Sequence, residues 1–297
     1  MSIKLDLYKV FCEVAKYNSF SKAAKSLYMT QPAVSQAISQ LESELGVRLF
    51  TRMPKGVILT NEGKQLFEYV NSAINLINTG EKKLIEAKNL MSGELNIGVG
   101  DTISRYFLLP YLEKFHTNYP NIRLKIINRT TIELCTLIKS GEIDIAICNL
   151  PIEDSSIEVK ELMVIHDVFV YGEGYKDELS KPMTIEELTK FPLILLEPSS
   201  NSRQYVEKFM LSKGIKIEPE IELGSHELLL EFARINLGIS CVVREFSYEY
   251  LQKGLLYEVQ LIDGIPERSI GVCSLKSVSL SPSSTKFVEI LKSERGV

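Results

Sequence analysis

The sequence predicts an N-terminal all-α module with a small β wing, one long linker helix, and a larger two-lobed α/β domain. The chain has 297 residues, of which 45% are hydrophobic and 24% are charged, enough for about two or three folded domains. Helical apolar spacing dominates the beginning of the chain, whereas strand-like and helix-like segments alternate after about residue 91. We therefore place the module at residues 1–60, the linker at 61–90 and the α/β domain at 91–297.

The composition argues against a membrane protein and against an enzyme. Every stretch of about 18 residues is interrupted by charges, and the chain does not start with a basic segment followed by an apolar one. The sequence also lacks the glycine-rich loops that bind nucleotide phosphates. We therefore expect a cytoplasmic protein that has no membrane partner and no enzymatic activity.

The cysteines and histidines show no pattern of a disulfide framework or of a metal site. The cysteines are odd in number and far apart: Cys12, Cys135, Cys148, Cys241 and Cys273. The three histidines have no helical i, i+4 spacing. We expect reduced, mostly buried thiols, no bound metal and no organic cofactor.

Charge is distributed unevenly along the chain. Residues 1–64 contain nine Lys and Arg against five Asp and Glu, a net charge of +4. Residues 93–297 contain 22 against 30, a net charge of −8. A basic module attached to an acidic domain favours binding of the module to a polyanion such as nucleic acid.

The apolar spacing of the module predicts three helices. The first ends near Tyr17, and the second lies between about Ser21 and Leu27. The third begins after Thr30, a good N-cap, and ends at Gly46. Two short helices joined by a tight turn are typical of helix-turn-helix proteins, which insert the second helix into the major groove of DNA.

The outer face of the third helix is polar but uncharged. Its residues are Gln31, Ser35, Gln36, Ser39 and Gln40. Gln pairs with the edge of adenine, and Ser bonds to bases or phosphates. Helix faces that meet only solvent usually carry Glu and Lys, so we favour insertion into DNA over a solvated surface.

A small hairpin follows the third helix. Residues 51–60 alternate in the manner of two short strands, with Gly56 near the turn. Such a wing would place Arg52 and Lys55 beside the phosphate backbone, where they position the module without reading sequence.

The motifs of this module resemble those of the LysR-type transcriptional regulators. The resemblance rests on Ser19-Phe20-Ser21-Lys22-Ala23-Ala24, on Thr30-Gln31-Pro32-Ala33-Val34-Ser35-Gln36-Ala37-Ile38, and on Leu41-Glu42, Leu45-Gly46, Leu49-Phe50, Arg52, Leu59-Thr60 and Glu62-Gly63. It implies a winged helix-turn-helix that binds double-stranded promoter DNA. It also implies an effector domain similar to periplasmic binding proteins, which binds a small-molecule effector.

By this resemblance, eight residues of the module contact DNA. Those that face bases or backbone are Gln31, Pro32, Ser35, Gln36 and Ser39, and those near phosphates are Arg52, Lys55 and Thr60. Many family members carry Arg where Gln36 and Ser39 stand here. This departure implies fewer phosphate or guanine contacts from the third helix.

The linker is predicted to form one proline-free helix with Thr60 as its N-cap. Its apolar residues repeat every seven positions, as in a coiled-coil seam: Val70, Ile77 and Leu84, interleaved with Leu66, Ala73, Gly80 and Ala87. The pattern predicts a homodimer, and the resemblance implies antiparallel pairing and often a homotetramer. The alternative is packing of the linker against its own effector domain.

The last domain alternates strands and helices after a hinge at Met91-Ser92-Gly93. We expect strands at Leu95–Val99, Arg123–Ile127, Ile143–Ile147 and Leu193–Leu196, and helices at Ile103–His116 and Ile132–Ser140. The chain is then expected to return to the first lobe through Ser269–Leu275 and a helix near Thr285–Leu291. This order predicts parallel sheets in two lobes around a cleft. Lobe I would cover about 91–163 and 265–297, and lobe II about 164–264.

Polar residues cluster where the strands of this domain lead into helices, the edge at which open α/β sheets bind ligands. The candidate effector-binding residues are Asp101, Thr102, Thr131, Asn149, Ser199, Ser200, Ser202, Arg203 and Ser225. Helix capping is an equally good explanation for any single Ser or Thr at these positions. However, such residues recur at several strand-to-helix junctions of the domain, and this recurrence favours a ligand site. Residues 198–203 also resemble a Pro-Gly-Ser-Gly-Thr-Arg pattern of family members that sense small anionic metabolites.

The sequence is compatible with an acidic effector and with one that carries an ammonium group. Arg203 and Arg129 are candidate counterions for an acid. Asp101 would repel an anion and favour an ammonium group, as in an amino acid.

Two other functions use the same features. An enzyme or a solute-binding protein would hold its substrate in the same cleft, although no Ser or Cys has a His in a recognisable catalytic spacing. A regulator switched by cysteine oxidation would need two accessible thiols placed to pair, whereas the cysteines of the α/β domain lie in apolar surroundings.

Overall fold

The computed structural model describes residues 3–54, 56–88 and 93–293. The chain divides into two compact units, one containing the N-terminal 85 residues and the other containing the two lobes. Lys55 and the predicted hinge residues Met91 and Ser92 lie outside the described residues. Among the helices that the structure describes, none combines the length and apolar character needed to cross a membrane.

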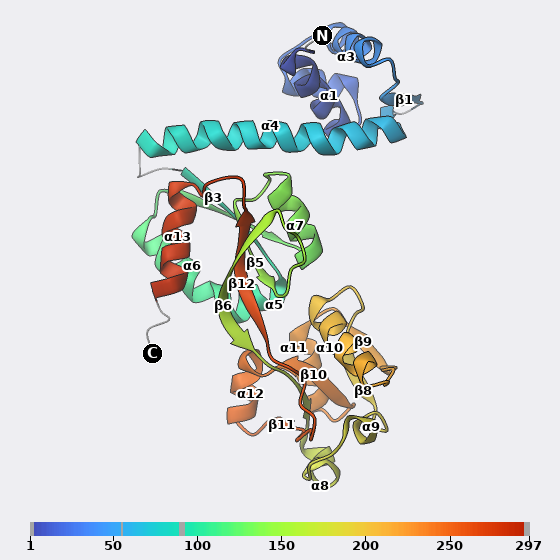
Figure 1. Cartoon of the computed structure of the whole chain (residues 1–297), viewed down its shortest axis with the longest axis vertical. Coiled ribbons are helices and arrows are strands. Elements are labelled where there is room, and N and C mark those ends of the chain that lie inside the picture. The colour runs from blue at the N-terminus through green and yellow to red at the C-terminus, as the bar shows by residue number, and fades with distance from the viewer. Residues whose placement is uncertain (1–2, 55, 89–92, 294–297) are drawn as a thin grey trace. The chain divides into compact units, whose positions relative to one another are not determined.

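The first unit is a three-helix module with a two-stranded wing (Figure 1). Its elements are α1 (Leu5–Tyr17), α2 (Phe20–Ser26), α3 (Gln31–Leu45), β1 (Phe50–Met53) and β2 (Gly56–Leu59). Helix α3 has the predicted ends, because the Thr30 hydroxyl accepts from the Ala33 N–H (3.4 Å) and Gly46 adopts a left-handed φ of 72°. The hydroxyl of Ser19 caps α2.

The core of this module ties the wing to the helices. Phe11 of α1 is fully buried and contacts Phe50 of β1, with 5.4 Å between the ring centroids. The N–H of Val57 donates to the carbonyl of Asn18 (3.1 Å). Gly56 has a φ of 128°, and a Cβ there would lie 2.5 Å from the same carbonyl oxygen, so the turn of the wing requires glycine.

The linker is the single helix α4 (Asn61–Lys88), capped by the Thr60 hydroxyl, which accepts from Gly63 N–H (3.0 Å). Leu66 and Val70 are half-buried and pack against the core of the module, and their place in an intermolecular seam stays a prediction. They pack there because the first turns of α4 cover apolar residues that the three helices leave open. The later seam residues Ala73, Ile77, Gly80 and Leu84 are exposed.

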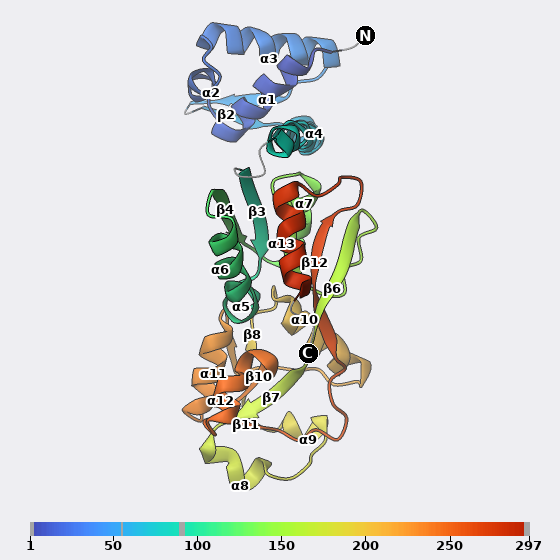
Figure 2. The ribbon, with the colours of Figure 1, turned by 90° about the vertical axis from the view of Figure 1, so that its left-hand side faces the viewer.

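Lobe I is built on a five-stranded sheet in the order β4-β3-β5-β12-β6. Its strands are β3 (Gly93–Val99), β4 (Ile122–Asn128), β5 (Ile145–Asn149), β6 (Ile157–Ile165) and β12 (Arg268–Leu275). Its helices are α5 (Asp101–Ile103), the π-helix η1 (Ser104–Leu108), α6 (Leu109–Asn118), α7 (Thr131–Lys139) and α13 (Pro282–Ser293). Helices α6 and α13 lie side by side (Figure 2), with Phe115 against Phe287 at 5.3 Å.

Lobe II is built on a second five-stranded sheet in the order β11-β7-β10-β8-β9. Its strands are β7 (Asp167–Tyr171), β8 (Leu193–Leu196), β9 (Ile221–Leu223), β10 (Ile239–Val243) and β11 (Tyr257–Glu258). Its helices are η2 (Glu173–Tyr175), α8 (Lys176–Leu179), α9 (Ile185–Leu188), α10 (Asn201–Ser212), α11 (His226–Arg234), η3 (Glu245–Ser247) and α12 (Tyr248–Gln252).

Both sheets are mixed, so the expectation of parallel sheets was only partly right. In lobe I, β3 runs parallel to β4 and β5, but β12 is antiparallel to β5 and β6. In lobe II, β10 runs parallel to β8 and antiparallel to β7. The cause is that the chain leaves lobe I through β6 and returns through β12 in the opposite direction, as Figure 1 shows.

Candidate DNA interface and effector cavity

The predicted DNA-binding face lies on the surface of α3. Gln31, Pro32, Gln36 and Ser39 are exposed, and Ser35 is half-buried. The opposite face carries the buried residues Val34, Ile38 and Leu41. The helix is thus held to the module by one apolar stripe, and its polar side chains are free to meet a groove.

A hollow of about 400 Å³ lies between α3 and the wing. Four predicted DNA-binding residues line it, namely Ser35, Ser39, Arg52 and Thr60. The Thr60 hydroxyl already donates to the carbonyl of Arg48 (2.7 Å) and caps α4, so its main role is structural. Lys55 lies outside the described residues, and its predicted phosphate contact stays a prediction.

Two exposed residues of the module, Tyr28 and Arg48, were not among the predicted DNA-binding residues. Tyr28 is 99% exposed in the turn before α3 and has a left-handed φ of 54°. Arg48 is exposed and lines the same hollow as Arg52. The sequence could have indicated that Tyr28 is exposed, because the turn of a helix-turn-helix offers no neighbouring residues that would bury a large aromatic side chain.

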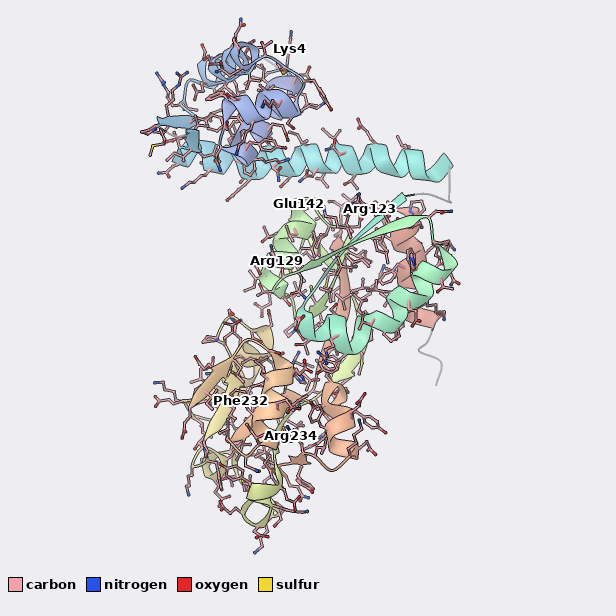
Figure 3. All side chains as sticks on the ribbon, turned by 180° about the vertical axis from the view of Figure 1, so that it is seen from behind. Lys4, Arg123, Arg129, Glu142, Phe232 and Arg234 are labelled. Atoms are coloured by element: carbon pink, nitrogen blue, oxygen red, sulfur yellow. The ribbon has the colours of Figure 1, made fainter. Side chains whose placement is uncertain are left out.

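A cavity of about 340 Å³ lies between the two lobes. From lobe I it is lined by the four predicted residues Asp101, Thr102, Thr131 and Asn149. They lie at or just beyond the carboxyl ends of β3, β4 and β5, which meet at one edge of the sheet because the three strands are parallel. Figure 3 shows the side chains of both lobes and labels Arg129, which also lines the cavity from lobe I.

From lobe II, the cavity is lined by the predicted residues Ser199, Ser200, Ser202 and Arg203. Ser225 does not line it, although its neighbours Gly224 and His226 do. The prediction for Ser225 was therefore displaced by one residue. Ser225 is the N-cap of α11, and the first residue of that helix takes its place at the cavity.

The helices whose N-termini face the cavity differ in whether a side chain caps the backbone N–H groups of the first turn. Helix α7 has a reciprocal cap, because the Thr130 hydroxyl accepts from the Glu133 N–H (3.5 Å) and the Glu133 carboxylate accepts from the Thr130 N–H (2.9 Å). The N-cap residues of α10 and α11, Ser200 and Ser225, make no side-chain capping bond. The positive dipole ends of α10 and α11 are thus left for another acceptor.

Arg203 is not the free counterion that the sequence suggested. Its side chain is 3% exposed, and it pairs with Glu207 (2.6 Å) and Glu222 (3.6 Å). It also donates to the carbonyl of Leu196 (3.2 Å). Its charge is therefore balanced within lobe II.

The exposed charges on the cavity wall are mostly negative. Asp101, Glu133 and Glu197 are exposed there, against the exposed Arg129. Arg129 donates to the carbonyl of Asn128 (2.7 Å) and forms no carboxylate pair in the part of the chain that the structure describes. The wall therefore disfavours ligands with several negative charges.

A buried polar network beside the cavity joins the lobes. Arg268 of β12 donates to both carboxylate oxygens of Asp167, at the start of β7 (2.5 and 2.8 Å). It also donates to Asn149 of β5 (2.6 Å) and to Ser202 of α10 (2.9 Å). No local pattern indicates this network, because Arg268 and Asp167 are 101 positions apart.

Comparisons with known proteins agree with this architecture. The chain matches the family model of the LysR substrate binding domain over residues 88–296, and that of the bacterial regulatory helix-turn-helix proteins of the LysR family over residues 5–64. The chain belongs to the LysR family. Proteins of this family are transcriptional regulators that bind promoter DNA and small-molecule effectors, so the chain is a regulator with an effector-binding domain and not an enzyme.

Full-length LysR-family relatives cover nearly the whole chain. A RuBisCO operon transcriptional regulator of Allochromatium vinosum is 27% identical over 297 residues, which are 99% of this chain and 97% of that protein. A full-length OxyR variant from Pseudomonas aeruginosa has a TM-score of 0.71 at 20% identity and covers 98% of this chain and 94% of its own. Full-length CbnR in complex with its target DNA has a TM-score of 0.66 at 19% identity, with coverages of 98% and 99%. These structures share the fold.

The cysteines of this LysR-family regulator are mostly buried, as expected. Cys12, Cys148, Cys241 and Cys273 are buried, and Cys135 is half-buried. Burial raises the pKa of Cys12 to about 11 and raises the pKa of Cys241, on the cavity wall, well above its ordinary value. Because the thiolate is the reactive form, these two thiols are inert near neutral pH.

Proposed function

We propose that this LysR-family regulator is a cytoplasmic homodimer that reads promoter DNA with α3 and binds a small-molecule effector in the cavity between its lobes. The observation that carries the proposal is the convergence on that cavity of eight of the nine residues selected from the sequence. They come from separate strands and helices of both lobes, which is the usual construction of a ligand site at the edge of α/β sheets.

Effector binding would act by changing the arrangement of the lobes. A ligand that contacts both lobes binds one arrangement more tightly than another and thereby shifts the equilibrium between them. The Arg268 network is the fixed point of such a motion, because it connects β12, β5, β7 and α10 beside the ligand. In the dimer, the shift would change the angle between the paired DNA-binding modules.

The exposed apolar side of α4 supports the proposed dimer. Tyr69 and Leu84 are each 72% exposed, and Ile77 is 41% exposed. With the small residues Ala73 and Gly80, they recur along the helix at spacings of three to four residues and form one stripe. A second copy of α4 would cover this stripe, and two such dimers would form the homotetramer that the family resemblance implies.

The DNA-binding assignment is tested by comparing specific and non-specific binding of the full chain. An operator is first selected from random double-stranded DNA, and affinities are then measured by fluorescence anisotropy. Gln31→Ala should weaken operator binding by about 1–3 kcal/mol, with little effect on random DNA, because it removes a base contact. Arg52→Ala is the matched control, and should weaken binding to both DNAs because it removes a phosphate contact. Equal losses on both DNAs for Gln31→Ala would contradict the assignment.

A further inference from the structure

Three of the five cysteines gather in one apolar cluster of lobe I. Cys135 lies on α7, Cys148 on β5 and Cys273 on β12, and α7 packs on these two strands (Figure 1). Cys148 is paired across the strands with Gly271, two residues before Cys273, so both thiols leave the same face of the sheet. That face is the one that α7 covers.

The thiols of Cys135 and Cys148 are in hydrogen-bond contact. This bond lowers the pKa of Cys135, because the Cys148 S–H donates to the Cys135 thiolate. The same bond, a second one with Cys273, and burial raise the pKa of Cys148 well above its ordinary value. The thiolate is the nucleophilic form of cysteine, so Cys135 is the reactive member of the pair and Cys148 keeps its proton.

The two members of the pair also differ in accessibility. Cys135 is half-buried, whereas Cys148 is fully buried. Lys139, one turn further along α7, is exposed and pairs with Asp154 (2.9 Å), so charged groups border Cys135. Only the first thiol of an oxidisable pair has to meet the oxidant, because the second attacks within the chain. One accessible thiol is therefore sufficient here.

Both members of the pair adjoin residues of the cavity. Thr131, the first residue of α7, lies one turn before Cys135 and lines the cavity. Asn149 directly follows Cys148, lines the cavity and accepts from Arg268 (2.6 Å). A covalent bond between α7 and β5 would therefore act on two cavity residues and on the Arg268 network.

We propose that a hydroperoxide oxidises Cys135, that Cys135 then forms a disulfide with Cys148, and that this disulfide changes DNA binding through the cavity. Lobe I thus contains a modification site that is separate from the effector cavity. The effect on DNA rests on the proposed function, whereas the disulfide itself does not.

The oxidation has two steps. In the first, the Cys135 thiolate attacks the hydroperoxide: an S–O bond forms, the O–O bond breaks, and the leaving oxygen takes a proton from solvent. The sulfur loses two electrons, which reduce the peroxide to an alcohol or water, and Cys135 becomes a sulfenic acid. In the second step, the Cys148 sulfur attacks the sulfenic sulfur. The S–S bond forms, the S–O bond breaks, and hydroxide leaves with the proton of Cys148 as water.

The disulfide draws α7 and β5 together. Bonded sulfurs lie about 2.05 Å apart, closer than two thiols in hydrogen-bond contact. The interior of lobe I is packed and transmits such a strain, because it has no room to absorb it. Thr131 and Asn149 therefore change their positions in the cavity wall when the disulfide forms.

Peptide mapping tests the disulfide directly. Trypsin places each cysteine in a different peptide, because cleavage after Arg129, Lys139 and Lys160 gives peptides 130–139, with Cys135, and 140–160, with Cys148. The reduced full chain is treated with hydrogen peroxide, its remaining thiols are alkylated in denaturant, and the digest is analysed by mass spectrometry. We expect these two peptides to be linked and the other three cysteines to be alkylated. Absence of this link, or linkage of another pair, would overturn the proposal.

Three variants assign the roles of the thiols. Cys135→Ser removes the nucleophile and should form no disulfide. Cys148→Ala removes the second thiol, so Cys135 should stop at the sulfenic acid, which dimedone traps. Cys273→Ala is the matched control, since Cys273 is also buried beside Cys148, and it should form the disulfide as the parent does. A disulfide in Cys135→Ser, or its loss in Cys273→Ala, contradicts these roles. The map of the parent chain does not depend on whether the variants fold.

Fluorescence anisotropy with the selected operator tests the effect on DNA binding. We expect oxidation to change the operator affinity of the full chain about fivefold or more, a change that a reductant reverses and that Cys135→Ser does not show. A disulfide that leaves the affinity unchanged would overturn its action through the cavity. If the reduced chain selects no operator, the proposed function fails, and the peptide map still decides the chemistry of the thiol pair.

Discussion

Arg105 of η1 and Glu227 of α11 form an ion pair with two nitrogen–oxygen distances of 2.5 and 2.9 Å. The pair joins lobe I to lobe II next to the contact between Tyr106 and His226. It thus couples α11 to the π-helical turn after β3. A π-turn inside a helix often marks a functional site, and here it aims two consecutive side chains at the other lobe.

Arg105→Gln should affect ligand binding more than stability. The two side chains are 54% and 43% exposed, so the pair contributes less than about 1 kcal/mol to unfolding. Because the pair joins the two lobes that enclose the cavity, its loss should weaken binding of the effector about two- to fivefold. Calorimetric titration checks this, with Lys216→Gln as control, since Lys216 forms an exposed pair with Glu218 within lobe II (2.7 Å). Equal effects of the two substitutions on affinity would show that ligand binding does not depend on whether the ion pair joins the two lobes.

Arg268→Met should destabilise the junction of the lobes strongly. Arg268 and Asp167 are each 2% exposed, so the variant leaves a buried carboxylate without its cation. The expected loss is about 3–5 kcal/mol in urea unfolding. Adding Asp167→Asn removes the buried charge and should recover a large part of that loss. A loss below about 1 kcal/mol in the single variant would mean that water reaches the carboxylate.

The buried His226 predicts a loss of stability in mild acid. Burial holds the pKa of His226 at about 4, against about 6.5 in the unfolded chain. The unfolded chain therefore binds a proton in this range that the folded chain excludes, so the contribution is complete above pH 6.5 and decreases as the pH falls toward 4. Between pH 7.5 and 5, the decrease is about 2 kcal/mol. Urea unfolding of His226→Gln should show a pH dependence smaller by this amount, and identical dependences would contradict a neutral His226.

Acidic substitutions on α4 should dissociate the dimer. Ile77→Glu with Leu84→Glu places like charges in the exposed stripe, where two copies of the helix would meet. Both residues are exposed, so the fold of one chain should be retained. Analytical ultracentrifugation should show half the mass of the parent protein. Leu211→Glu on α10, at a residue that is 61% exposed, should keep the parent mass. An unchanged mass in the double variant would place the interface elsewhere.

Features that depend on a few neighbouring residues were predictable. The third helix, its Thr30 cap and its Gly46 end are confirmed, as is the strand Leu193–Leu196. Capping bonds and left-handed residues act within about four positions, so the sequence contains their causes.

Features that depend on the partner of a side chain were not predictable. Leu66 and Val70 have the spacing of a coiled-coil seam, and that spacing did not predict that they also pack against the core of their own module. Arg203 was expected to face a ligand, yet two glutamates from different elements neutralise it. The spacing of residues shows which face of a helix is apolar or charged, and not what that face contacts.

The sequence by itself determined the order of the parts, the polar face of α3 and the edge of the sheets where the cavity lies, because each follows from periodicity within one element or from the order of elements. Only the tertiary structure decided which groups of the cavity are satisfied. Arg268 meets Asp167 across 101 positions, and Val243 meets His226 across 17. The first of these hydrogen bonds exists only once both sheets are assembled, and the second only once α11 packs on β10. The contacts of Arg268 leave it without a free charge for a ligand.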